Sequence, residues 1–148
     1  MKQKTLIIVK PDGVKKKLVG ECLKRFEKAG LEIKELKVTR LKRPFMHKFY
    51  AHLKKRLNPK LYKAIIDYLT SGPVVIAIME GNNAVNKAIR ITGPTDPKAA
   101  KKGTIRGDYG TDVMAICLKK KKAVKNIVHR SGSAPEAKTE IRMIKKLF

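Results

Sequence analysis

Short apolar runs and amphipathic segments alternate along the chain. Residues 6–9 predict a strand, and residues 74–79 form the continuous apolar run that is typical of a strand buried on both faces. Residues 31–38 alternate apolar and polar side chains but change phase at residues 34–35, which predicts a strand with a β-bulge. A last, short strand is expected at residues 126–129.

Apolar residues at helical spacing fill the segments between these strands. The first such series runs from Val19 to Phe26, and Gly30 stands where a helix C-terminal cap is expected. Two further helical segments are expected, one over residues 46–53 and one over residues 60–69.

Two later helices are expected from their first residues. Asn83 has the residue type of an N-cap and precedes a helix that would bury Val85. Ser133 and Glu136 match a capping box at the start of a final helix, whereas residues 92–122 form the longest loop-like region. The order strand, helix, strand, helices, strand, helix, strand, helix predicts a protein of the mixed α/β (α+β) class.

Length and cysteine content limit the class of protein further. A chain of 148 residues fits a single domain over residues 1–148. Cys22 and Cys117 have neither the close spacing of a zinc site nor the density of a secreted disulfide scaffold, so we expect structural thiols and a cytoplasmic location. No apolar run is long enough to span a bilayer, so we expect a soluble protein.

The chain is strongly basic. Its 36 Lys and Arg residues against 12 Asp and Glu residues give a formal net charge of +24. The charge gathers at residues 15–17, 54–56, 101–102 and 119–122, and a field of this size attracts polyanions. Two interpretations stay open, a solvated basic surface and non-specific binding of nucleic acid. Single-strand binders usually place aromatic side chains among basic ones, and this chain has only 4 Phe, 4 Tyr and no Trp.

A histidine stands at the end of the last expected strand. Pairing of that strand would fix the imidazole of His129, and Ser131, Gly132 and Ser133 offer hydroxyl groups and a flexible backbone for a phosphate. An imidazole is a good phosphoryl acceptor because it is largely neutral and nucleophilic at about pH 7. It needs orientation, and Glu140 in the final helix is placed to accept a hydrogen bond from one ring nitrogen. The alternative interpretations are that His129 is a structural histidine and that Glu140 is a solvent-facing carboxylate.

Three other segments carry residue types that suit phosphate. They are Lys-Pro-Asp-Gly at residues 10–13, Gly-Pro-Thr-Asp-Pro at 93–97 and Gly-Thr-Ile-Arg-Gly-Asp at 103–108. With Ser-Gly-Pro-Val at 71–74 and the histidine motif at 126–133, they resemble the signatures of the nucleoside diphosphate kinase family. The resemblance covers essentially the whole chain, with the motifs in the same order.

The resemblance implies a ferredoxin-like fold, in which helices pack on a four-stranded antiparallel sheet. It also implies transfer of the terminal phosphate of a nucleoside triphosphate to a nucleoside diphosphate through a phosphohistidine, with broad selectivity for base and sugar. Mg²⁺ is expected to arrive on the nucleotide phosphates, and no protein residue is expected to bind a metal. Family members form homo-oligomers, so a tetramer or hexamer is expected.

The same resemblance implies roles for individual residues. His129 matches the nucleophile, Glu140 its orienting carboxylate and Ser131 the serine partner. The position that stacks on the base falls on Leu61, with Tyr62 beside it as the alternative. The implied nucleotide-binding residues are Lys10, which also serves in catalysis, Tyr50, Leu61, Arg90, Thr95, Arg106 and Asn126.

The chain departs from the family pattern in several places. Arg130 replaces the usual small residue after the histidine, where it either holds phosphate or crowds it, and Gly132 replaces the usual aspartate. The family's arginine position before the Gly-x-Thr-x-Pro motif is Ile89, and Arg90 lies one residue on, about 100° around the helix. Residues 114–122 form a lysine-rich insertion.

The sequence is also compatible with two other functions. A family member with low or no activity would act as a basic protein that binds nucleic acid or other polyanions, and a purely structural homologue would do neither. Incubation with labelled ATP distinguishes the three, because only the kinase yields an acid-labile, base-stable phosphoprotein.

Overall fold

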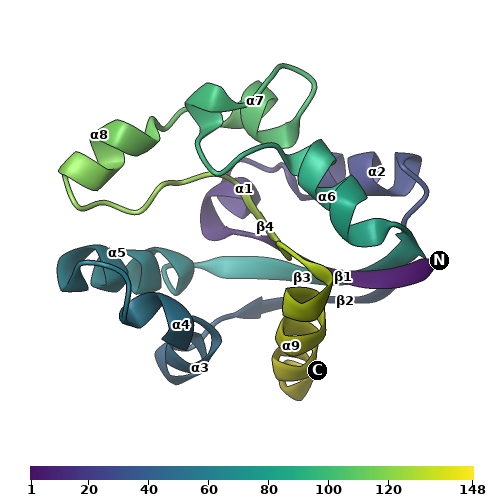
Figure 1. Cartoon of the computed structure of the whole chain (residues 1–148), viewed down its shortest axis with the longest axis horizontal. Helices are drawn as coiled ribbons and strands as arrows, with labels where there is room; N and C mark the ends of the chain where they lie inside the picture. The colour runs from purple at the N-terminus through teal and green to yellow at the C-terminus, as the bar shows by residue number, and fades with distance from the viewer.

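The computed structural model describes residues 1–148 and contains a four-stranded antiparallel sheet in the order β2-β3-β1-β4 (Figure 1). The strands are β1 (Lys2–Val9), β2 (Glu32–Arg40), β3 (Pro73–Asn82) and β4 (Val128–Arg130). The two central strands are β3 and β1, and the edges are β2 and β4. This sheet confirms the mixed α/β class and the ferredoxin-like arrangement expected from the sequence.

Helices cover both faces of the sheet, because side chains of the central strands alternate between two cores (Figure 1). In β1, Ile7 and Val9 point to one face and Leu6 and Ile8 to the other, and all four are buried. The first face, the α2-side core, packs against α1 (Pro11–Lys15), α2 (Val19–Lys28), α6 (Ala84–Thr92) and α7 (Ile105–Tyr109). The second face, the α5-side core, packs against α3 (Arg43–Phe49), α4 (Ala51–Lys54), α5 (Pro59–Leu69) and α9 (Ala134–Ile144).

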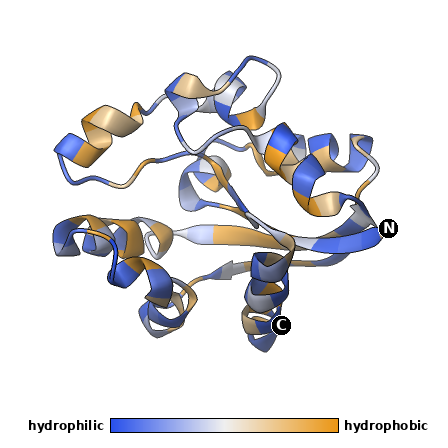
Figure 2. Cartoon of the chain, in the orientation of Figure 1, coloured by the Kyte–Doolittle hydropathy of each residue, from blue (hydrophilic) through white to orange (hydrophobic).

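Hydropathy follows this layering. Figure 2 shows the apolar stretch of β3 at the centre of the molecule, between the two helical layers. Every residue from 74 to 79 is buried, as the continuous apolar run predicted. None of the helices is both long enough and apolar enough to cross a membrane.

The expected helix ends are confirmed at α2 and α9. Gly30 has φ 91°, and the Leu31 N–H donates to the Phe26 carbonyl at 3.2 Å, which closes α2. At the start of α9 the Ser133 hydroxyl accepts from the Glu136 N–H at 3.2 Å, which confirms the N-cap. The second bond of the expected capping box differs, since the Glu136 carboxylate accepts from the Gly132 N–H at 2.8 Å and not from the Ser133 N–H.

The expected cap of α6 is wrong in its mechanism. Asn83 directly precedes α6, but its φ of 53° is left-handed and its side chain caps no helical N–H. Gln3, at the start of β1, supplies the cap, and its Oε1 accepts from the Val85 N–H at 2.8 Å. A local sequence pattern around Asn83 cannot reveal a capping residue that lies 82 positions from Val85.

Three segments differ from the sequence-based expectation. The single helix over residues 46–53 is two helices, α3 and α4, which meet at Tyr50. The region 92–122 is not a loop throughout, since it contains a 3₁₀ turn (Pro97–Ala99), α7 and α8 (Met114–Lys119). The last strand begins at Val128, later than expected, and a 3₁₀ turn (Lys145–Leu147) follows α9.

The β-bulge expected in β2 is confirmed by a register shift between Ile33 and Glu35. Beyond the bulge, Leu36 and Val38 are 51% and 67% exposed. The apolar positions in this half of β2 therefore face outward, along an edge of the sheet.

Candidate active site

A strained turn leads the chain into β4. Ile127 has φ 77°, unusual for a β-branched residue, and the Val128 N–H donates across it to the Asn126 carbonyl at 2.8 Å. Such a conformation costs about 1–3 kcal/mol. The Lys10 N–H donates to the Ile127 carbonyl at 2.8 Å, and Asp12 Oδ2 accepts from the Ile127 N–H at 3.1 Å. These bonds hold the turn against the end of β1.

The imidazole of His129 is held by the final helix. Its Nε2 lies 3.1 Å from Oε1 of Glu140, and the Ser131 hydroxyl donates to the same oxygen at 2.7 Å. The Ser131 hydroxyl also accepts from the Leu6 N–H at 3.2 Å, which ties the group to β1. Burial favours a higher pKa for the Glu140 carboxyl, but the hydrogen bonds from His129 and Ser131 and the charge of His129 outweigh it and hold this pKa below its ordinary value. Nδ1 is then the ring nitrogen left for a substrate.

Two aromatic rings stand beside the imidazole. The ring centroids of Phe49 and Tyr50 lie 5.8 Å and 6.5 Å from that of His129, both edge-on. Burial raises the pKa of the Tyr50 hydroxyl above its ordinary value, so this group stays a neutral donor. The break between α3 and α4 thus brings Tyr50 next to the histidine.

Lys10 lies at the end of β1 and is only 9% exposed. Its Nζ donates to Asn126 Oδ1 at 2.7 Å and lies 5.8 Å from the ring centroid of Tyr68. Burial, together with the charge of Arg106, lowers the pKa of Lys10 to about 7. The Asn126 amide also donates to the Thr95 carbonyl at 3.0 Å, so three residues expected at the nucleotide share one hydrogen-bonded group.

Arg106, in the first turn of α7, is 4% exposed and braces the same turn. Its guanidinium donates to the carbonyls of Asn126, Gly93 and Val128 at 3.2, 3.1 and 2.7 Å. Burial, together with the charge of Arg130, lowers the pKa of Arg106 to about 10, so it remains a cation at neutral pH. Its remaining N–H groups stay available for an anion.

A cavity of about 260 Å³ lies between α5 and α8 and reaches Lys10. Lys10, Thr95 and Asn126 form its polar end, and the rest of the wall is mostly apolar. Leu61 lies in this wall, whereas Tyr62 is buried in the α5-side core. The other wall residues are Tyr50, Leu53, Leu57, Ile65, Tyr68, Leu69, Met114, Leu118, Ala123 and Val124.

Most of this apolar wall was not predicted from the sequence. On α5, Leu61 and Ile65 are four positions apart on one face of the helix, whereas Leu57 lies in the turn between α4 and α5. Met114 and Leu118 are also four positions apart, on one face of α8. They belong to the insertion that looked like a loop.

Arg90 is not brought together with the other expected site residues. It is exposed on α6 and takes part in none of the contacts described above. The neighbouring Ile89 is half-buried, so α6 directs no cation toward His129.

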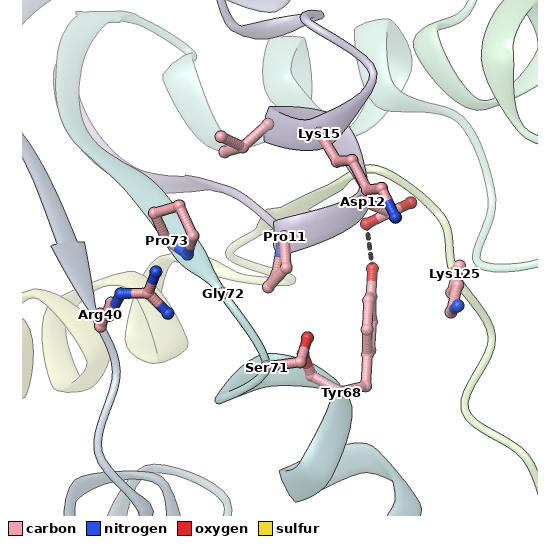
Figure 3. Close-up of a pocket in the computed structure, with 10 residues that line it drawn as sticks. Pro11, Asp12, Lys15, Arg40, Tyr68, Ser71, Gly72, Pro73 and Lys125 are labelled. Atoms are coloured by element: carbon pink, nitrogen blue, oxygen red, sulfur yellow. Dashed lines mark hydrogen bonds between the residues drawn. The ribbon is translucent and has the colours of Figure 1, made fainter.

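A second cavity, of about 540 Å³, lies beside α1 (Figure 3). Asp12 and Tyr68 stand in its wall, and the Tyr68 hydroxyl donates to the Asp12 carboxylate. Asp12 therefore shapes the turn and the cavity wall. Lys15, Arg40 and Lys125 also line this cavity, which shares only Tyr68 with the cavity that reaches Lys10.

The molecule combines a ferredoxin-like sheet, a histidine held by Glu140, and a cavity that reaches Lys10 and whose wall residue Tyr50 lies beside that histidine. These features are typical of a protein that handles phosphate. The nucleoside diphosphate kinase family model matches residues 3–146. The nucleoside diphosphate kinase of Staphylothermus marinus is 41% identical over 144 residues, which cover 97% of this chain and 93% of that protein. The enzyme of Pyrococcus horikoshii is also 41% identical, over 97% of this chain and 85% of its own.

The similar solved structures are also nucleoside diphosphate kinases. A transition-state mimic of the Borrelia burgdorferi nucleoside diphosphate kinase with bound vanadate and ADP has a TM-score of 0.90 and 31% identity, and covers 96% of this chain and 86% of that one. The Pyrobaculum aerophilum enzyme has a TM-score of 0.86 and 33% identity, over 97% and 95% of the two chains. The chain belongs to the nucleoside diphosphate kinase family, and its activity is transfer of the terminal phosphate of a nucleoside triphosphate to a nucleoside diphosphate.

Proposed function

We propose that Nδ1 of His129 accepts the phosphoryl group. The observation that carries this proposal is the 3.1 Å contact between Nε2 and Glu140, which leaves Nδ1 free. As the bond from Nδ1 to phosphorus forms, the bond to the leaving diphosphate oxygen breaks and that oxygen takes the electron pair. Glu140 stabilises the positive charge that develops on the ring. A second nucleoside diphosphate then takes the phosphoryl group by the reverse step.

The cationic end of the cavity is proposed to bind the phosphates. Charge spreads over the equatorial oxygens of the transferring group, so fixed cations lower the barrier. Lys10 in the cavity wall supplies one cation, and Arg106, which donates to the backbone of the lining residue Asn126, supplies a second. Thr95 and Tyr50 supply hydroxyl donors. Asn126, which already contacts Lys10 and Thr95, is proposed to reach the sugar hydroxyl.

The apolar wall of the cavity is proposed to hold the base, with Leu61 against one face. Few side chains there can read the base edge by hydrogen bonds, which supports broad base selectivity. Mg²⁺ is proposed to enter bound to the nucleotide phosphates, whose oxygens are the ligands it prefers.

Labelling tests this assignment. Incubation with ATP labelled on its terminal phosphate should give an acid-labile, base-stable phosphoprotein, and His129→Ala should abolish it with an unchanged circular dichroism spectrum. His47→Ala is the matched control and should label normally. Label that persists on His47 or His52 in the His129→Ala protein would refute the assignment of His129 as the phosphoryl acceptor.

A homo-oligomer, tetramer or hexamer, is proposed for the assembled enzyme. The edge strand β2 exposes Leu36 and Val38 beside its unpaired backbone groups, a surface that monomers rarely leave open. Light scattering should give a multiple of 16.7 kDa, and Val38→Lys should shift the mass toward the monomer. A monomeric wild-type protein would contradict the proposal.

Non-specific nucleic-acid binding is proposed as a second role, favoured by the net charge of +24. Affinity for a mixed-sequence oligonucleotide should fall steeply with salt and weaken when residues 119–122 are neutralised. If no binding is measurable at ~0.1 M salt, the basic residues form only a solvated surface and this second role is refuted. The free thiols of Cys22 and Cys117 support a cytoplasmic location for both roles.

A further inference from the structure

The motifs at residues 10–13 and 71–74 meet at the end of α5, beside Tyr68 (Figure 3). The Ser71 hydroxyl donates to the Tyr68 carbonyl at 2.6 Å, which fixes this residue at the end of the helix. The Tyr68 side chain points toward α1, where its hydroxyl donates to the Asp12 carboxylate. One tyrosine, for which the sequence predicted no role, therefore joins the two motifs.

Tyr68 is buried between two cavities. It lines both the cavity beside α1 and the cavity that reaches Lys10. Burial, together with the negative charge of Asp12, raises the pKa of the Tyr68 hydroxyl above its ordinary value, so this group stays a neutral donor. The Tyr68 ring centroid lies 5.8 Å from Lys10 Nζ, so the ring offers its face to this cation. Tyr68 thus contacts the α1 turn through its hydroxyl and the nucleotide cavity through its ring.

Asp12 connects Tyr68 to the strained turn before β4. One carboxylate oxygen of Asp12 accepts from the Tyr68 hydroxyl, and the other accepts from the Ile127 N–H at 3.1 Å. The peptide between Asn126 and Ile127 is thereby held from two sides, since its carbonyl accepts from Arg106 Nε at 3.2 Å. Loss of the Asp12 contact would leave this peptide held from one side only.

The conformation of Ile127 depends on such contacts. Its φ of 77° is unusual for a β-branched residue, and a backbone of this kind persists only where the surrounding structure fixes it. The helix α1 packs directly on the turn, because a Cβ on Gly13 would lie 2.8 Å from the Ile127 carbonyl oxygen. Within this packing Tyr68 orients the Asp12 carboxylate, since its hydroxyl binds the oxygen that Ile127 leaves free.

The strained turn sets the relative positions of the groups that are proposed to act on the nucleotide. Asn126 directly precedes Ile127, and its Oδ1 accepts from Lys10 Nζ at 2.7 Å. His129 follows two positions after Ile127, in β4. A displaced turn would therefore move the sugar ligand and the phosphoryl acceptor together, and a misplacement of about 1 Å can slow a reaction ~10²-fold.

We propose that Tyr68 is a positioning residue for phosphoryl transfer, whose hydroxyl holds Asp12 and thereby the turn that leads to His129. This inference rests on the proposed function, since it takes His129 as the acceptor. Tyr68 exchanges no proton and forms no bond to the substrate in the reaction. Because it belongs to α5, it also ties the helix that lines the base cavity to the strand that carries the nucleophile.

The test compares Tyr68→Phe with Tyr62→Phe as its matched control. Each change removes one hydroxyl from a buried ring on α5, but the Tyr62 hydroxyl lies 3.0 Å from Nδ1 of His47 and not beside the turn. In rapid-quench experiments with labelled ATP, Tyr68→Phe should form the phosphoenzyme roughly tenfold more slowly, because the reacting groups lose their alignment. Its affinity for ADP should change by at most about twofold, and Tyr62→Phe should match the wild type in both measurements.

A double substitution tests whether Tyr68 acts through Asp12. Asp12→Ala should slow phosphoenzyme formation at least as much as Tyr68→Phe does. The protein with both changes should be no slower than Asp12→Ala alone, because the tyrosine has nothing left to hold. Asp12→Asn should recover part of the rate, since its amide oxygen still accepts a hydrogen bond.

A phosphorylation rate for Tyr68→Phe within about twofold of the wild type would overturn the inference while leaving His129 as the acceptor. Rate losses that multiply in the double variant would also overturn it, because Tyr68 would then act independently of Asp12. The same holds for equal losses in rate and ADP affinity, which mean uniform binding, and for an equal slowing in Tyr62→Phe, which means a general loosening of α5. If Asp12→Ala fails to fold, Asp12→Asn takes its place in the double variant.

Absence of label on the wild-type protein would instead refute the proposed function itself.

Discussion

Arg106 braces the turn before β4 and is proposed to bind the phosphates as well. Arg106→Ala leaves three buried carbonyl oxygens without this partner, so the free energy of unfolding should fall by about 2–4 kcal/mol. Turnover should fall as well, by ~10²-fold, because charge is lost at the transition state. Urea unfolding and steady-state kinetics measure the two effects. Unchanged stability would contradict the bracing role, and a change confined to KM would show that Arg106 only binds.

Lys10 is expected to take up a proton when a nucleotide binds. Its pKa of about 7 leaves it mostly neutral at higher pH, and bound phosphates favour the charged form. At about pH 8.5 the phosphates are fully ionised, so ADP binding should take up about one proton. Calorimetry in buffers of different ionisation enthalpy measures this number. Lys10→Met should bind ADP without uptake and turn over slowly; undiminished uptake would place the proton elsewhere.

Glu140 is expected to matter through the orientation and charge of the imidazole. Glu140→Gln keeps an oxygen that can accept from His129 but removes the negative charge, so phosphoenzyme formation should slow by about 10–10²-fold. The loss should be smaller than for His129→Ala, since the nucleophile remains. Equal losses would mean that Glu140 does more than orient and stabilise the ring.

The sequence motifs suggested the residues of this site and one contact among them, the bond between His129 and Glu140, but not the other contacts. Motif spacing predicted His129, Glu140 and Lys10 as site residues, and the structure brings the first two within 3.1 Å. The bond between Lys10 and Asn126 joins residues 116 positions apart, so only the folded sheet reveals it. The backbone bonding of Arg106 was hidden for the same reason.

At the scale of elements, prediction succeeded where the apolar pattern was strong. The central strands and α2 were found because their buried faces repeat regularly, whereas α7 and α8 were missed because each is short. Both are held by distant polar contacts as well as local ones. Asp96, for example, accepts from the Met114 N–H at 3.1 Å and so fixes the start of α8.

The helix α8 is expected to form one wall of the base site. Leu118 lines the cavity, so Leu118→Ala should raise KM for nucleoside triphosphates roughly tenfold at unchanged kcat, as loss of uniform binding predicts. Ile116→Ala is the matched control, because Ile116 lies on the same helix outside this cavity. Steady-state kinetics with ATP and GTP measure the effect. An unchanged KM for Leu118→Ala would mean that the base does not lie against α8.

The whole molecule carries far more positive than negative charge, and little of it is locally neutralised. Of the lysines and arginines, those in ion pairs are Arg25, Lys34, Arg43, Lys63 and Lys145. The remaining cations repel one another in the folded state and raise the local concentration of anionic nucleotides. Net charge was fully predictable from the sequence, but this sparse pairing was not.

Salt is therefore expected to move stability and activity in opposite directions. Raising the salt from about 0.02 M to 0.5 M shortens the Debye length from roughly 20 Å to about 4 Å, which relieves the repulsion and should raise the melting temperature. The same screening weakens the steering of nucleotides, so kcat/KM should fall. Scanning calorimetry and steady-state kinetics across one salt series measure both. A melting temperature that drops with salt would mean that ion pairs between the basic residues and the 12 carboxylates outweigh the repulsion among the basic residues. The excess positive charge would then not limit stability.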